Sequence, residues 1–132
     1  FSATGDTLRA IAHAGAYFQE NVPRYTETAH LVRSKEMGKG LAAALGDAWA
    51  VLMRNHGITF CGRSVPHSVI MGYFLERACF QQITLGTSGL DWQGSTADEV
   101  TSKGPNLMTD TTIGLFWAHF RRKLAKFEKP GG

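Results

Sequence analysis

A pair of short apolar runs on either side of a tight polar turn constrains this fold more than any other stretch of the sequence. Trp49–Met53 and Ile58–Cys61 each have the length of a buried strand, and Asn55-His56-Gly57 lies between them. Short apolar runs that are bounded by turn-forming residues are typical of strands buried in a sheet. We therefore expect a strand, a tight turn and a second strand in this part of the chain.

Helix signals flank these two runs. Ser34 is suited to cap a helix over Lys35–Leu45, which is rich in Ala and Leu. Ser64 is the expected cap of the longest helix, which has a proline in its first turn and continues to Gly86. Helices before and after the strands, with a sheet between them, indicate an α/β architecture.

The two ends of the chain give less regular signals. Short apolar pieces separated by glycines over residues 1–25 favour short strands and turns, and the Gly- and Ser-rich stretch Thr87–Pro105 is expected to be a loop. A last helix is predicted after caps at Thr109–Thr112, because large apolar residues recur there at three- and four-residue spacing. These residues are Ile113, Phe116, Trp117, Phe120 and Leu124.

The composition sets outer limits on function. The chain has 132 residues, of which 43% are hydrophobic, and this suits one globular domain. Its net charge is +3, and apart from the cluster Arg121-Arg122-Lys123 the basic residues are spread along the chain. This spread of charge argues against a nucleic-acid-binding surface. Cys61 and Cys79 form neither a disulfide framework nor a zinc pattern. No apolar run reaches the roughly 18 residues that would cross a bilayer. A soluble cytoplasmic protein is the expectation.

His56 is the first residue to weigh as a chemical group. A histidine in a glycine-containing turn at the end of a buried strand can hold its imidazole rigidly toward a cleft. One histidine is not a metal site, however, because catalytic zinc-type sites take about three protein ligands and leave a position open. On the residues alone, a structural histidine is the favoured interpretation.

The residues around His56 carry a family resemblance. The stretch Ala48–Gly62, with its apolar strand, Arg-Asn-His-Gly turn and second strand, is followed by a helix that contains Glu76, and this order is similar to the class II aldolase/adducin family. The resemblance implies an α/β fold in which helices flank a central, mostly antiparallel sheet. It also implies that residues 1–132 form the C-terminal portion of a single such domain.

The same resemblance implies a metal. In class II aldolases the histidine equivalent to His56 is the third ligand of a divalent ion, and the imidazole ligand alone does not distinguish Zn, Mn, Fe or Co. The other two ligands come from a His-x-His pair that this sequence lacks. Phe1-Ser2-Ala3 is similar to the strand that follows this pair. We therefore expect the N-terminal part of the domain to belong to an absent segment or a separate chain.

Two further residues are candidates for catalysis. His13 lies in the stretch Leu8–Phe18, which is similar to the branch of the family that decarboxylates hydroxylated aromatic acids. The resemblance implies that His13 lines the substrate pocket and moves a proton. The alternative is a histidine in a turn that is hydrogen-bonded to the backbone. Glu76 shares a helical stripe with large apolar residues, so its carboxylate needs a partner. An ion pair with an arginine is favoured over catalysis for Glu76.

The remaining candidates concern substrate binding. Arg54 and Arg9 could grip a carboxylate through the two parallel donors of guanidinium, although surface roles are commoner. The resemblance implies an oligomer, here a homotetramer, with pockets at the interfaces between subunits. Tyr73 and His119 could therefore complete the cleft of a neighbouring subunit. The alternative is that both residues only pack against their neighbours. Two other histidines, His30 and His67, receive no role.

The function that these observations favour is a metal-dependent carbon–carbon lyase. The apolar, aromatic stretch His13–Phe18 suits a flat ring, so we expect decarboxylation of a small hydroxylated aromatic or heteroaromatic carboxylate. The alternatives are aldol cleavage of a small hydroxy-carbonyl or sugar-phosphate substrate, a non-catalytic interaction domain like the head of adducin, and an iron-binding oxygenase branch. Without a glycine-rich phosphate fingerprint, a nucleotide cofactor is not expected.

Overall fold

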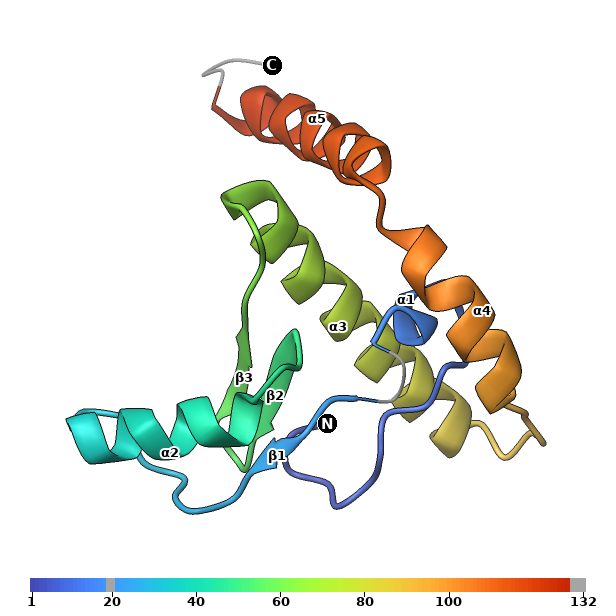
Figure 1. Ribbon diagram of the computed structural model, residues 1–132. Helices are drawn as coiled ribbons and strands as arrows, with labels where there is room; N and C mark the ends of the chain where they lie inside the picture. Colours follow the sequence, from blue (N-terminus) through green and yellow to red (C-terminus); the bar gives the residue numbers. More distant parts are fainter. Residues whose placement is uncertain (19–20, 129–132) are drawn as a thin grey trace.

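Five helices and a three-stranded sheet make up residues 1–18 and 21–128, the part of the chain that the computed structural model describes (Figure 1). In chain order the elements are α1 (His13–Ala16), β1 (Arg24–Tyr25), α2 (Lys35–Leu45), β2 (Ala50–Met53), β3 (Gly57–Phe60), α3 (Val65–Thr87), α4 (Ala97–Leu107) and α5 (Asp110–Phe127). None of these helices is both long enough and apolar enough to cross a membrane.

The expected strand, turn and strand are confirmed. β2 lies in the middle of the sheet, pairs antiparallel with β3 and parallel with β1, and is buried along its whole length. The turn between β2 and β3 closes through a hydrogen bond from the amide of His56 to the carbonyl of Met53, with N and O 3.1 Å apart. Asn55 has a φ of 54°, a left-handed conformation that asparagine accepts more readily than most residues.

The expected helices around the sheet are also found. Ser34 caps α2 by accepting a hydrogen bond from the amide of Met37, and Ser64 caps α3 in the same way with the amide of His67. Thr109 caps α5 through the amide of Thr112. These caps agree with the sequence signals, because N-caps depend on local chemistry alone.

Of the two expectations for the irregular segments, one holds only in part and the other is wrong. Residues 1–25 contain a short strand, β1, and a turn closed by the bond from the N–H of Thr4 to the carbonyl of Phe1. The apolar pieces before residue 19, however, form no strand; Leu8 and Ala10 are buried in an extended segment without sheet partners, and His13–Ala16 is a short helix. The stretch expected to be a loop contains α4, which begins at a capping box in which Thr96 and Glu99 each bond the other's backbone. That Thr-x-x-Glu signal is readable in the sequence, but the surrounding Gly, Ser and Asp outweighed it.

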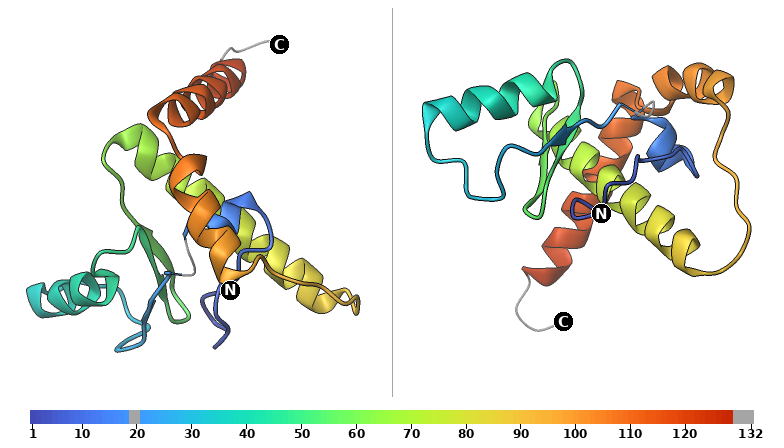
Figure 2. Two further views of the ribbon diagram at one scale, coloured as in Figure 1. Left: turned by 45° about the vertical axis from the view of Figure 1, so that its right-hand side comes forward. Right: turned by 90° about the horizontal axis from the view of Figure 1, so that it is seen from below.

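The core forms on one face of α3. This helix lies between the sheet, with α2 beyond it, and the pair formed by α1 and α4 (Figures 1 and 2). Its buried side chains pack against Ala50 of β2 and against the N-terminal segment around Phe18. The buried residues of α3 are His67, Ile70, Met71, Gly72, Leu75, Ala78 and Gln82.

The stripe of α3 that carries Glu76 faces the other way. Val69, Phe80 and Ile83 are 40%, 64% and 43% exposed, and Glu76 is exposed with them. The sequence interpretation, in which these apolar residues would bury the Glu76 carboxylate, is therefore wrong for this chain. α3 has two apolar faces, and the described residues cover only one of them.

Gln82 ties the N-terminal segment to α3. Its amide nitrogen donates to a carboxylate oxygen of Asp6 and to the carbonyl of Thr7, both at 2.9 Å, and its amide oxygen accepts from the backbone N–H of Arg9 at 2.8 Å. The side chain is 3% exposed, so these bonds form in a largely dry setting. Together with the guanidinium of Arg24, which donates to the carbonyls of Ser2 and Asp6, this glutamine holds a chain segment without regular structure in one position.

Candidate functional site

His56 occupies the tip of the β2–β3 hairpin. The left-handed Asn55 and the extended, positive-φ Gly57 on either side of it fix the backbone of the turn. The imidazole is exposed, so it is free to meet a ligand or another protein segment. Arg54, the expected carboxylate-binding residue, is exposed in the same turn. Whether His56 binds a metal and Arg54 a substrate stays a prediction.

A cavity of about 300 Å³ lies beside this turn, between β3 and α3. Gly57, the residue that follows His56, lines it, and Glu76 and Cys79 contribute its polar side chains. Apart from Ser2, the rest of the wall is apolar and comes from Phe1, Leu52, Ile58, Leu75, Phe80 and Ile83. An apolar cavity with few polar groups is the usual form of a small-molecule site.

The two titratable side chains of this cavity differ in character. Burial is the main cause that raises the pKa of the Cys79 thiol, and the nearby Glu76 carboxylate adds to the rise. The thiol is therefore protonated at neutral pH and is a poor nucleophile. Glu76 is exposed and forms no ion pair with any described lysine or arginine, so the expected arginine partner is absent from residues 1–18 and 21–128.

The described residues do not by themselves fit a metal ion. Nowhere in these two ranges do three or more His, Cys, Asp or Glu side chains gather closely enough to hold one. His56 offers a single imidazole, and a catalytic site needs about three protein ligands. A metal bound at His56 would therefore take its other ligands from outside the described residues.

His13 lies elsewhere. It is the first residue of α1, it is exposed, and it lines a cavity of about 320 Å³ together with Ser95 and Lys103. Glu76 lines a different cavity, so the structure does not bring the two expected catalytic residues together. Arg9 is also exposed, with its guanidinium 5.4 Å from the ring centre of Trp92.

Tyr73 and His119 come together around one aromatic ring. The ring centre of Phe120 lies 5.0 Å from that of Tyr73 and 5.8 Å from that of His119. His119 is exposed on α5 and lines a hollow of about 340 Å³, whereas Tyr73 is half-buried and accepts a hydrogen bond from Arg77 at 3.4 Å. Their packing role is thus seen, and a substrate-binding role for either one stays a prediction.

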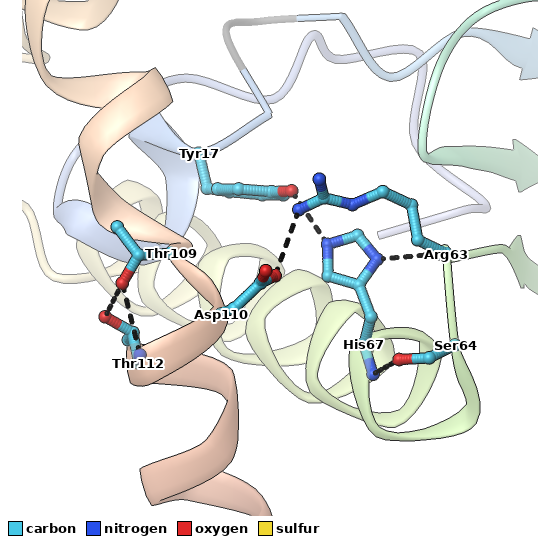
Figure 3. A network of polar contacts seen from close by, with 7 residues as sticks. All are labelled: Tyr17, Arg63, Ser64, His67, Thr109, Asp110 and Thr112. Atoms are coloured by element: carbon cyan, nitrogen blue, oxygen red, sulfur yellow. Dashed lines mark hydrogen bonds and ion pairs between the residues drawn. The ribbon is translucent and has the colours of Figure 1, made fainter.

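The sequence interpretation missed the most buried titratable pair. His67 is 1% exposed, and its Nε2 lies 3.1 Å from the hydroxyl of Tyr17 (Figure 3). Its Nδ1 accepts the backbone N–H of Arg63 at 3.1 Å. Because Nδ1 accepts, the proton of the neutral ring is on Nε2, which donates to Tyr17. The position three residues after a serine cap was the available signal, because it places His67 in the first turn of α3.

Charged groups surround this pair at the surface. A guanidinium nitrogen of Arg63 lies 3.8 Å from a carboxylate oxygen of Asp110 at the start of α5, with side chains 63% and 96% exposed. Such a long, solvated pair contributes little stability. Burial is the main cause that lowers the pKa of His67, and Arg63 lowers it further, whereas Asp110 raises it. His67 is therefore neutral at physiological pH.

Comparisons with known proteins agree with this architecture. Residues 1–83 match the family model described as Class II Aldolase and Adducin N-terminal domain. The chain is 31% identical over 101 residues to a 3,4-dihydroxyphthalate decarboxylase of Rhodococcus jostii (strain RHA1), covering 74% of this chain and 40% of that protein. It is 30% identical over 112 residues to Decarboxylase tropJ of Talaromyces stipitatus, covering 71% and 42%.

A solved structure shows the same fold. The aldolase II superfamily protein from Pseudomonas syringae superposes with a TM-score of 0.79 at 25% identity, over 95% of this chain and 50% of that one. The chain spans less than half the length of the curated relatives that it matches, between 40% and 46%. The family match over residues 1–83 and the shared fold agree, and this chain belongs to the class II aldolase and adducin family.

Proposed function

We propose that this chain is part of a lyase that removes carbon dioxide from a small hydroxylated aromatic or heteroaromatic carboxylate. The observation that carries the proposal is its identity of about 30% to two decarboxylases over more than two thirds of its length. The apolar cavity beside His56 supports it, since such a wall suits a flat ring better than a polyol phosphate.

The proposed roles follow from chemistry and position. When the carboxylate leaves as carbon dioxide, its bonding electrons stay on the ring carbon, which then takes up a proton. Arg54 would orient the departing carboxylate, and His13 or Glu76 would hold or deliver the proton. A divalent metal (Zn, Mn, Fe or Co) would supply Lewis-acid stabilisation, with His56 as one of its ligands. His13 and Glu76 line different cavities, so His13 can hold or deliver the proton only in an assembly that joins these two cavities.

The assembly is the second part of the proposal. We infer a cytoplasmic homo-oligomer, a tetramer by resemblance, in which Tyr73 and His119 reach a neighbour's pocket. The segment carrying the remaining metal ligands precedes this stretch in the same polypeptide or belongs to a separate chain. The uncovered apolar face of α3, with Val69, Phe80 and Ile83, gives such a segment a surface to pack against.

The assay that tests the proposal uses the whole protein. We expect it, loaded separately with Zn, Mn, Fe or Co, to release carbon dioxide from a panel of dihydroxybenzoic and dihydroxyphthalic acids, measured by gas analysis and by product chromatography. Cleavage of aldol substrates without carbon dioxide release would replace the decarboxylase with an aldolase. Oxygen consumption would indicate an oxygenase, and inactivity together with no metal binding would favour an adducin-like interaction domain.

A second measurement tests the incomplete metal site. Residues 1–132 alone, purified without a tag and dialysed, are expected to retain far less than one metal ion per chain, because His56 supplies one of about three ligands. Elemental analysis by mass spectrometry gives the ratio. Retention of one ion per chain after dialysis would show that the chain holds a complete site.

A further inference from the structure

The buried imidazole of His67 lies where three parts of the fold meet. Tyr17 ends α1, Arg63 belongs to the loop that leads from β3 into α3, and His67 is in the first turn of α3 (Figure 3). The ring of Trp49, just before β2, stacks edge-on against the imidazole with ring centres 4.8 Å apart. One side chain thus contacts the residue that leads into β2, the loop before α3 and the residue that follows α1.

We propose that His67 is an acid-sensitive lock that holds the loop between β3 and α3 against the first turn of α3 while its imidazole is neutral and releases that loop when it is protonated. Nδ1 accepts the Arg63 amide and Nε2 donates to Tyr17, so both nitrogens are occupied in the neutral form. Protonation places a second N–H on Nδ1, opposite the N–H of Arg63. Two donors then face each other, and the hydrogen bond is lost.

The loop packs closely against one side of the ring. A Cβ at Gly62 would lie 2.7 Å from Nδ1 of His67 and 2.5 Å from the backbone nitrogen of Ser68, so the loop backbone passes directly against the imidazole. Only glycine fits at this approach. Loss of the hydrogen bond to Arg63 therefore acts on a loop that is packed directly against the ring and that carries Ser64, the cap of α3.

Three charged or titratable groups near the ring affect how readily the imidazole of His67 takes up a proton. From α1, the pKa of Tyr17 is raised, mainly by burial, so its hydroxyl stays protonated and offers the ring no negative charge. From the loop, the guanidinium of Arg63 opposes a second positive charge. From α5, the carboxylate of Asp110 favours the imidazolium, but it is 96% exposed and screened by water.

The sign of the pH effect follows. The pKa of His67 lies below 6.5 in the folded protein, so the unfolded chain takes up the proton at a higher pH than the folded one. The stability contributed by neutral His67 is fully present above pH 6.5 and is lost as the pH falls from there toward the folded pKa. One group lowers the folding equilibrium constant by at most about tenfold per pH unit.

Nuclear magnetic resonance on residues 1–132 gives the direct test. We expect the imidazole nitrogens of His67 to show the neutral Nε2–H form at about pH 7.5, and the amide signals of Arg63 and Tyr17 to shift together when the ring titrates on acidification. His67→Asn, which keeps an acceptor near the Arg63 amide but does not titrate, should reduce the fall of the urea midpoint as the pH drops below 6.5, because it removes the contribution of His67. His30→Asn, at an exposed histidine, should keep that fall.

Three outcomes would overturn the proposal. One is a His67 that titrates at or above the ordinary value while the Arg63 and Tyr17 signals stay unchanged. Another is a pH dependence of the urea midpoint that is unchanged in His67→Asn. The third is a pH dependence of the urea midpoint that is lost in His30→Asn. If His67→Asn does not fold, the nitrogen shifts of the unmodified chain still decide, because they report the tautomer and the titration directly.

Discussion

His56→Ala in the whole protein is expected to abolish carbon dioxide release and to lower bound metal to near zero. Under the proposed function the variant loses an imidazole ligand, and with it Lewis-acid stabilisation of several kcal/mol, which corresponds to about 10³-fold in rate or more. The fold should persist, because the side chain is exposed in a turn whose backbone is fixed by its neighbours. Metal analysis, carbon dioxide release and circular dichroism on one preparation provide the measurement.

His13→Ala is the matched comparison for this effect. It should keep most of the metal while turnover falls by about 10²- to 10⁴-fold, the usual contribution of a positioned proton-transfer group. His30→Ala, at another exposed histidine without a proposed role, should change neither quantity. A His56→Ala variant with full metal content and full activity would remove His56 from the site.

Gln82→Leu is expected to lower the free energy of unfolding by about 2 to 3 kcal/mol. Leucine keeps most of the volume but removes two donors and one acceptor, and it leaves the N–H of Arg9 without its side-chain partner in a largely buried setting. The extended segment from Asp6 to Arg9 then loses its attachment to α3. Urea unfolding followed by circular dichroism measures the change.

The neighbouring Gln81 gives a control of the same chemistry. Its amide oxygen is buried and has no hydrogen-bond partner among the described residues. Gln81→Leu should therefore leave the stability unchanged within about 0.5 kcal/mol or raise it slightly. Equal losses of stability in Gln81→Leu and Gln82→Leu would show that the hydrogen bonds of Gln82 do not account for its contribution to stability.

Local chemistry made much of the fold readable in the sequence. The runs before and after His56 became β2 and β3, and serine and threonine caps placed the starts of α2, α3 and α5 correctly. These signals act within a few residues, so no knowledge of distant contacts is needed to use them. The family also followed from one local stretch around the Arg-Asn-His-Gly turn, and the family match confirms it.

The failures share a physical cause. α3 has apolar residues on two faces, and helical spacing alone cannot say which face a given set of neighbours will cover. The sequence therefore led to a buried Glu76, whereas the described chain buries the face that carries His67 and Gln82. The extended segment around Leu8 could not be distinguished from a strand, because its hydrogen bonds go to a glutamine more than 70 residues away.

The sequence by itself determined β2, β3, the helices α2, α3 and α5 with their caps, the His56 turn and the family, because each depends on residues that are close together in the chain. Only the tertiary structure decided which side chains meet. It separated His13 from the cavity of Glu76, left His56 without further described metal ligands, and brought Tyr17 and His67 together across 50 residues. Side chains from distant segments come into contact only when the core packs, and their spacing in the sequence does not record that contact.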